Sequence, residues 1–348
     1  MIRIQNVYYM LAYAFQVLNE QTYRNLATEE FANTADLFAA ILSKGISSQI
    51  RRGLGKAYIQ EAEALSAPRG KIDISSSIKA QIIHKRQLVC SYDEFSVDTK
   101  MNRIIKSTVM LLVKSNVSKS RKRELLKLMV FFNDVGTIDL HSVDWHINYN
   151  RNNQTYRMLM GICFLTVRGL LHTQSDGSTK LMDFLDEQRM HRLYEKFILE
   201  YYKKEFPRIS ANASQIPWQL DDDMDSMLPV MQSDIMLSFK EKVLIIDAKY
   251  YTHSTQVQYG VHTLHSGNVY QIFTYVKNKE AELSDAPHEV SGMLLYAKTD
   301  EDVFPENVYH MSGNKITVRT LNLDCDFTEI RKQLDAIASE HFGDELYA

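Results

Sequence analysis

The sequence predicts an α/β fold of the α+β kind, with a mixed central sheet flanked by helices in its C-terminal half. Segments of helical and strand-like periodicity alternate there, at residues 188–204, 230–239, 243–251, 268–277, 290–297, 316–323 and from Phe327 onward. Val243 to Ile246 is an unbroken apolar run, which is typical of a buried central strand. The length of 348 residues suits two domains, and we expect them at residues 1–165 and 166–348.

The N-terminal half predicts a mixture of helices and strands. Its helical segments are residues 1–20, 34–52, 102–114, 119–133 and 156–171. Strands are expected within residues 57–74, where Pro68-Arg69-Gly70 marks a turn, and residues 76–90 read as helix followed by strand. Residues 137–157 are polar and irregular.

Composition and charge limit the class of protein. Hydrophobic residues make up 45% and charged residues 24%, as in an ordinary globular protein, and no segment has the length of apolar sequence that a membrane span needs. The three cysteines lie far apart, so neither a disulfide framework nor a structural zinc site is predicted, and a cytoplasmic location is favoured. The net charge of −3 hides a basic stretch from Lys44 to Lys127, with 18 Lys and Arg against 7 Asp and Glu. This stretch suits a nucleic acid or an acidic partner, or else it is simply a solvated surface.

Two charged residues end the apolar strand of the second half. Asp247 and Lys249 are two residues apart, so they emerge on the same face of the strand, and Ala248 faces away. A buried carboxylate needs a cation or hydrogen bonds to remain charged. A structural ion pair between the two side chains would meet that need without any function.

A second acidic residue changes this interpretation. Asp234 lies in the preceding strand, and a tight hairpin over residues 239–242 would return that strand alongside the next one. Asp234 and Asp247 then converge, and with the backbone carbonyl of Ala248 they form an all-oxygen site suited to Mg²⁺. Lys249 would orient the attacking water or stabilise charge in the transition state.

The flanking helices supply further candidates. Gln271 and Tyr275 are four residues apart on one face of the predicted helix at 268–277, where they could line the cleft and hold a DNA phosphate or the water beside Lys249. Glu195 in the preceding helix is a candidate third metal ligand, with a solvated surface position as the alternative. Tyr250 could stack on a base or a sugar, although a tyrosine beside a buried strand is more often part of the core.

This ordered pattern of Asp234, Asp247-x-Lys249 and Gln271-xxx-Tyr275 resembles the PD-(D/E)xK nuclease superfamily in its QxxxY branch, with Ser233 at the position of the motif's proline. It further resembles McrC, the nuclease subunit of the McrBC modified-cytosine restriction system. The segments that carry this resemblance are Asn6-x-Tyr8-Tyr9-Met10-Leu11, Arg51-Arg52-Gly53-Leu54, Gly70-Lys71-Ile72, Tyr92-Asp93-Glu94-Phe95, Asn102-Arg103-Ile104-Ile105, Leu228-Pro229-x-Met231, Ile245-x-Asp247-Ala248-Lys249-Tyr250-Tyr251 and Asn268-x-Tyr270-Gln271.

The resemblance implies a Mg²⁺-dependent DNA endonuclease, with Asp234, Asp247, Lys249 and Gln271 as catalytic residues. It implies a partner, an McrB-like AAA+ GTPase hexamer that reads the modified cytosine in double-stranded DNA and is stimulated by the N-terminal domain of this chain. The sequence has no GxxxxGK(S/T) phosphate-binding motif, which agrees with GTP being bound by the partner. Two alternatives stay open, an adaptor that mainly stimulates the GTPase and a stand-alone nuclease of the same superfamily.

Overall fold

The computed structural model describes residues 2–15, 26, 29, 31, 33–151, 153–173, 187–222, 224–251, 255–258, 261–298 and 304–346. The chain forms two compact units, Ala32–Met182 and a second that combines Met1–Phe31 with Asp183–Ala348. The division expected after residue 165 falls inside helix α7 (Tyr156–Thr173), which belongs to the unit Ala32–Met182. Within the described residues, no helix has the length and apolarity required to cross a membrane.

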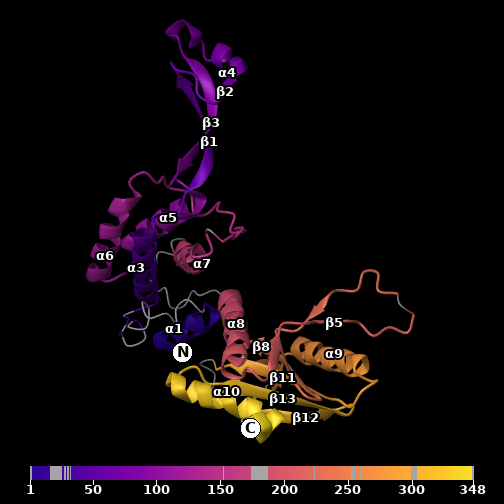
Figure 1. The fold of residues 1–348 in the computed structure, drawn as a ribbon. Coiled ribbons are helices and arrows are strands. Elements are labelled where there is room, and N and C mark those ends of the chain that lie inside the picture. Colours follow the sequence, from indigo (N-terminus) through magenta and orange to yellow (C-terminus); the bar gives the residue numbers. More distant parts are fainter. Residues whose placement is uncertain are drawn as a thin grey trace. The chain divides into compact units, whose positions relative to one another are not determined.

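The unit Ala32–Met182 combines a helical base with a small sheet. Its helical elements are α3 (Thr34–Arg52), α4 (Ile74–Lys79), η3 (Ile83–Lys85), α5 (Lys100–Lys114), α6 (Lys119–Met129), η4 (Val130–Phe132) and α7. Strands β1 (Ala57–Leu65), β2 (Lys71–Asp73) and β3 (Leu88–Ser96) form an antiparallel sheet in the order β1-β3-β2. This sheet arm, residues 57–96, extends away from the helices of its unit and carries α4 at its far end (Figure 1).

A buried hydrogen-bond network joins the sheet arm to its helices. The Asn102 side chain donates to the backbone carbonyls of Gly55 and Val97, at 2.9 and 2.7 Å. The Tyr156 hydroxyl donates to Asn102 Oδ1 at 2.7 Å and accepts from the Gly55 N–H at 2.7 Å. Asn102 is fully buried, so each of these bonds satisfies a polar group that has lost its water. The network fixes the arm where it leaves the helices.

The second unit is built on a six-stranded sheet in the order β12-β13-β11-β8-β7-β4. Its strands are β4 (Ser210–Asn212), β7 (Ile235–Phe239), β8 (Lys242–Lys249), β11 (Glu289–Ala297), β12 (Asn307–Met311) and β13 (Asn314–Leu321). Strands β8, β11 and β13 run parallel, whereas β4, β7 and β12 pair antiparallel with their neighbours. Two short pairs are added, β5 (Gln215–Ile216) with β6 (Met231–Gln232), and β9 (Thr255–Gln258) with β10 (Val261–Leu264). The expected mixed sheet is confirmed.

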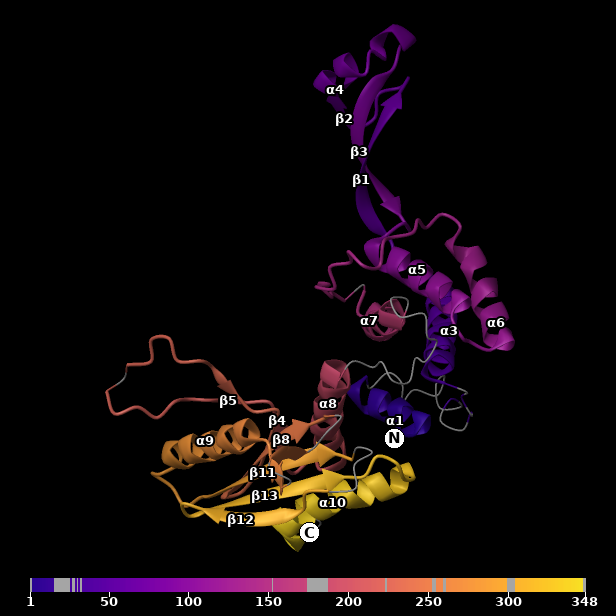
Figure 2. The same ribbon diagram turned by 180° about the vertical axis from the view of Figure 1, so that it is seen from behind.

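Helices cover both faces of this sheet. Helix α9 (Ser266–Glu282) lies on one face and α10 (Phe327–Phe342) on the other, with the short η6 (Asp344–Leu346) after it (Figure 2). Helix α8 (Glu187–Glu205) packs against β4, β7 and β8. Because the central parallel strands are covered on both faces, β8 and β11 are buried along almost their whole length. This burial explains the unbroken apolar run that the sequence shows there.

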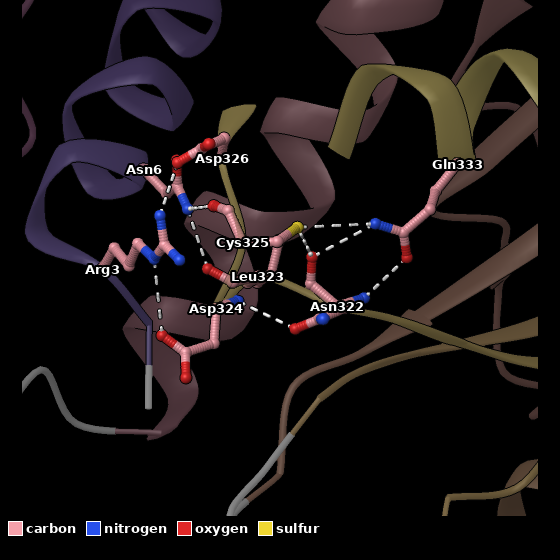
Figure 3. A network of polar contacts seen from close by, with 8 residues as sticks. All are labelled: Arg3, Asn6, Asn322, Leu323, Asp324, Cys325, Asp326 and Gln333. Carbon is pink, nitrogen blue, oxygen red and sulfur yellow. Dashed lines mark hydrogen bonds and ion pairs between the residues drawn. The ribbon is translucent and has the colours of Figure 1, made fainter. Parts of the chain in front are cut away.

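The first helix, α1 (Ile4–Ala14), belongs to this second unit although it begins the chain. Asn6 is 1% exposed, and its side-chain amide donates to the carbonyls of Leu323 and Cys325, both at 2.8 Å (Figure 3). The Tyr13 hydroxyl donates to Glu205 of α8 at 2.8 Å. These contacts hold α1 against α8 and the loop before α10. Residues 32–182 are therefore an insertion between two segments of one folded unit.

Candidate active site

The site begins where the ladder between β7 and β8 ends. The last paired residues are Ile235 and Ile246, and one further step of this register would set Asp234 opposite Asp247. The chain leaves the ladder at that point to form β6, so the Ala248 N–H has no strand partner on this side. The Asp234 Oδ2 accepts that N–H at 3.0 Å instead. The sequence predicted one strand over residues 230–239, whereas the structure breaks it at Ser233 and Asp234.

Asp247 and Lys249 form a buried ion pair on the α9 face of the sheet. Lys249 Nζ lies 2.9 Å from Asp247 Oδ1 and 2.8 Å from Oδ2. The side chains are 1% and 8% exposed for Asp247 and Lys249, so water screens the pair very little. The ion pair between Asp247 and Lys249, which was the alternative to a metal site, is therefore present. Asp234 also lies next to this pair, as the metal site would require.

Helix α9 extends this arrangement. Gln271 Oε1 accepts a hydrogen bond from Lys249 Nζ at 3.2 Å, and the Gln271 side-chain amide donates to the Tyr275 hydroxyl at 2.9 Å. Tyr275 is 9% exposed and packs in the core between α9 and the sheet. The two helical residues thus form a chain of contacts that ends on Lys249. Gln271 and Tyr275 fix the position of the ammonium group.

Helix α8 places Glu195 close enough to the site to interact with it electrostatically. Burial raises the pKa of Glu195 to about 7, and Asp234 adds to that effect while Lys249 and Arg192 oppose it. Glu195 Oε1 also lies 3.1 Å from His191 Nε2, one helical turn earlier. The structure therefore brings Glu195 toward Asp234 and Lys249, two residues far from it in the sequence.

The site holds more negative charge than its one lysine balances. Burial raises the pKa of Asp247 above its ordinary range; Lys249 lowers it in part, and Asp234 raises it further. Burial alone would lower the pKa of Lys249, but the attraction of Asp247 outweighs this and the net pKa is raised. Lys249 is therefore a cation at neutral pH, a state that suits a hydrogen-bond donor and positive charge but not a general base.

The donor set fits a magnesium ion in its chemistry. Asp234 and Asp247 are two adjacent carboxylates in a site short of positive charge, and Mg²⁺ is commonly held by one or two carboxylates together with waters. Among the residues that the structure describes, no three His, Cys, Asp or Glu side chains are grouped closely enough to hold a metal. The role of Glu195 as a third metal ligand stays a prediction.

Two of the predicted residues occupy supporting positions. The Ala248 side chain is fully buried and faces away from Asp247, as the strand alternation predicted. The Tyr250 ring lies 6.4 Å from that of Tyr194 on α8, centroid to centroid, so it contacts this helix. The role of the Ala248 carbonyl as a metal ligand, and of Tyr250 and Tyr275 in lining a DNA cleft, stay predictions.

The contacts of Ser233 and His191 were not predicted, although Ser233 was noted at the position of the motif's proline. Ser233 is 1% exposed; its N–H and its hydroxyl both donate to the Ser214 carbonyl, at 3.0 and 3.1 Å. These bonds fix the bend that presents Asp234. His191 precedes Glu195 by four residues, a spacing that places both on one helix face and would have identified the pair.

This chain is similar to known proteins over most of its length. The family model described as "McrBC 5-methylcytosine restriction system component" matches residues 4–297. A curated Escherichia coli K12 protein, "Type IV methyl-directed restriction enzyme EcoKMcrBC", is 29% identical over 347 residues, which cover 98% of each chain.

Two solved structures are also similar. One is a refined half-complex from a tetradecameric assembly of Thermococcus gammatolerans McrB AAA+ hexamers with bound McrC, with a TM-score of 0.49, 15% identity, and coverage of 97% of this chain and 75% of that one. The other is the McrBC complex of the same organism, with a TM-score of 0.40, 21% identity and 58% coverage of each chain. Both TM-scores are below 0.5, so the family assignment is based on the sequence matches.

Proposed function

Because this chain belongs to the McrBC 5-methylcytosine restriction system component family, as its McrC-type member, we propose that it is a Mg²⁺-dependent DNA endonuclease subunit. The observation that carries the proposal is the pairing of Asp234 with Asp247-x-Lys249 at the split between β7 and β8. Two carboxylates beside a fixed cation can bind a metal ion and stabilise the charge that develops in phosphodiester hydrolysis.

The protein's own groups have distinct tasks in this proposal. Lys249, held between Asp247 and Gln271, keeps its charge and donates hydrogen bonds to the attacking water or to a phosphoryl oxygen. Tyr275 holds Gln271 and so limits the positions that the ammonium group can take. Asp234, oriented by the Ala248 N–H, directs a carboxylate oxygen into the site. When bound between Asp234 and Asp247, Mg²⁺ would polarise the phosphoryl oxygen and lower the pKa of the attacking water.

The second part of the proposal concerns the partner. We assign an McrB-like AAA+ GTPase hexamer as the partner, which binds the GTP and reads the modified cytosine in double-stranded DNA. The tip of the sheet arm is the candidate docking element because it presents apolar side chains to solvent: Ile74 and Ile78 of α4 are 64% and 60% exposed. Exposed branched side chains at the end of a protruding arm favour insertion into a complementary protein surface.

Substitutions in the active site and in the arm test the two parts of the proposal separately. Asp234→Asn keeps an oxygen that can accept the Ala248 N–H but removes the charge, so we expect DNA cleavage to fall at least about 100-fold. Stimulation of the partner's GTPase should remain. Ile74→Lys combined with Ile78→Lys should abolish GTPase stimulation, while Asp234, Asp247 and Lys249 stay unaltered. Asp225→Asn, a change of the same kind in an exposed loop, is the control. Full cleavage by Asp234→Asn would refute the assigned active site.

A further inference from the structure

A pocket of about 420 Å³ opens on the α9 face of the six-stranded sheet, outside the cluster formed by Asp234, Asp247 and Lys249. This volume lies in the range of small-molecule sites, roughly 300–1,000 Å³. The residues of its floor and walls that matter here are Leu294, Val318, Phe304, Asn307, Tyr309 and Thr263. The floor is apolar, and the walls carry the aromatic rings of Phe304 and Tyr309 and the polar side chains of His262, Thr263 and Asn307.

The pocket and the candidate active site share one row of residues across the sheet. Asp247 of β8 pairs with Leu294 of β11, Leu294 pairs with Val318 of β13, and Val318 pairs with Asn307 of β12. Paired residues on neighbouring strands direct their side chains to the same face. Neighbouring strands are roughly 5 Å apart, so the pocket floor begins about one strand from Asp247.

The lining has the chemistry of a site for a heterocyclic base. Phe304 and Tyr309 are 39% and 36% exposed, so their rings are accessible for stacking. Asn307 and Thr263 offer donors and acceptors to the edge of such a ring. Lys298 lies 4.7 Å from the centre of the Phe304 ring and places a positive charge beside this wall, where the phosphate of the same nucleotide would be.

We propose that this pocket binds one unpaired base of the DNA strand next to the phosphate that is cut. The inference rests on the proposed nuclease function and deepens it, because it assigns a contact to the substrate beyond the reacting phosphate. Stacking in the pocket would hold the strand at a fixed distance from Asp247 and Lys249. Since an aromatic surface accepts every base, the site positions the strand without selecting its sequence.

Two neighbouring residues of β12 provide a matched test. Asn307 lines the pocket, whereas Val308 points to the opposite face of the sheet, where it lies near Leu244 and Met293. Asn307→Trp therefore fills the pocket, and Val308→Trp adds the same bulk on the other side. Tyr309→Ala removes a stacking ring and is the second variant. Each variant is prepared as the full chain and combined with the AAA+ partner.

The probe is duplex DNA that carries a single 2-aminopurine at successive positions around the cut phosphate. The fluorescence of 2-aminopurine changes when it leaves the base stack, and Ca²⁺ replaces Mg²⁺ so that the strand is bound but not cut. In the unaltered protein we expect one position to respond. Asn307→Trp should abolish this response and Tyr309→Ala should weaken DNA binding roughly tenfold, while Val308→Trp should behave as the unaltered protein does.

The outcomes distinguish this inference from the proposed function. If the unaltered protein cuts DNA but Asn307→Trp and Val308→Trp bind and cut alike, the base pocket is refuted and the nuclease assignment stands. If Asn307→Trp instead loses binding to the AAA+ partner, the pocket is a protein docking site and the inference is overturned. If the unaltered protein does not cut DNA with Mg²⁺ and the partner, the proposed function itself has failed.

Discussion

The ion pair between Asp247 and Lys249 allows catalysis and structure to be separated by a double-mutant cycle. Lys249→Met keeps the length and apolar stem of the side chain but leaves the Asp247 carboxylate buried without its cation. The side chains are 1% and 8% exposed, so this change should destabilise the fold by about 3–5 kcal/mol at pH 8. The loss should shrink toward pH 6, where Asp247 can take up a proton, because its pKa is already raised.

Combining Lys249→Met with Asp247→Asn removes both charges at once. Neutral groups of similar shape in place of a buried pair are often nearly neutral in stability, so we expect most of the lost free energy of unfolding to return. Cleavage should not return. Lys249→Met, Asp247→Asn alone and the double variant each lack a group that stabilises the transition state, so we expect at least a 100-fold lower rate in all three, roughly 3 kcal/mol or more.

The assays are urea unfolding at pH 6 and 8, Mg²⁺-dependent DNA cleavage, and stimulation of the partner's GTPase. GTPase stimulation at the unaltered level shows that a variant still docks, so a loss of cleavage can be assigned to the site. Recovery of both stability and cleavage in the double variant would refute the reasoning. The pair would then be a structural element, and the active site would lie elsewhere.

Three further predictions follow from particular contacts. Gly292→Ala should cost about 1–3 kcal/mol in urea unfolding, because a Cβ there would lie 2.8 Å from side-chain atoms of Ile272 on α9; a cost near zero would contradict this packing. Tyr275→Phe removes the acceptor of the Gln271 amide, a bond worth about 1 kcal/mol, and should lower the cleavage rate about fivefold without lowering stability equally. Burial, followed by nearby lysines, lowers the pKa of His341 to about 4. Below about pH 6.5 the His341 side chain therefore binds a proton in the unfolded chain but not in the folded one. The free energy of unfolding should fall between about pH 6.5 and 4, and His341→Leu should make this fall smaller.

The secondary structure was predictable wherever the pattern is local and long. The helix at residues 34–52 was predicted with the bounds that α3 has, and the apolar run at Val243 predicted the buried strand β8. Short exposed strands gave no such signal, and β12 is the clearest case, because its side chains are largely exposed and lack a two-residue alternation of burial. The pocket beside β12 was therefore invisible in the sequence.

The sequence by itself determined which groups this protein brings to its site. Asp234, Asp247-x-Lys249 and Gln271-xxx-Tyr275 are recognisable because strand and helix periodicities are local properties of the chain. Only the tertiary structure decided how they meet. The ladder that ends at Ile235 turns Asp234 toward the Ala248 N–H, and packing of α8 brings Glu195 near from about forty residues away.

The same distinction applies to the organisation of the chain. Sequence order suggested an N-terminal domain followed by a C-terminal one, but α1 folds with the C-terminal unit because Asn6 finds its buried partners at Leu323 and Cys325. Burial and hydrogen bonding between segments more than 300 residues apart depend on the folded shape, and no local pattern records them. The contacts of Asn6 could therefore be found only in the tertiary structure.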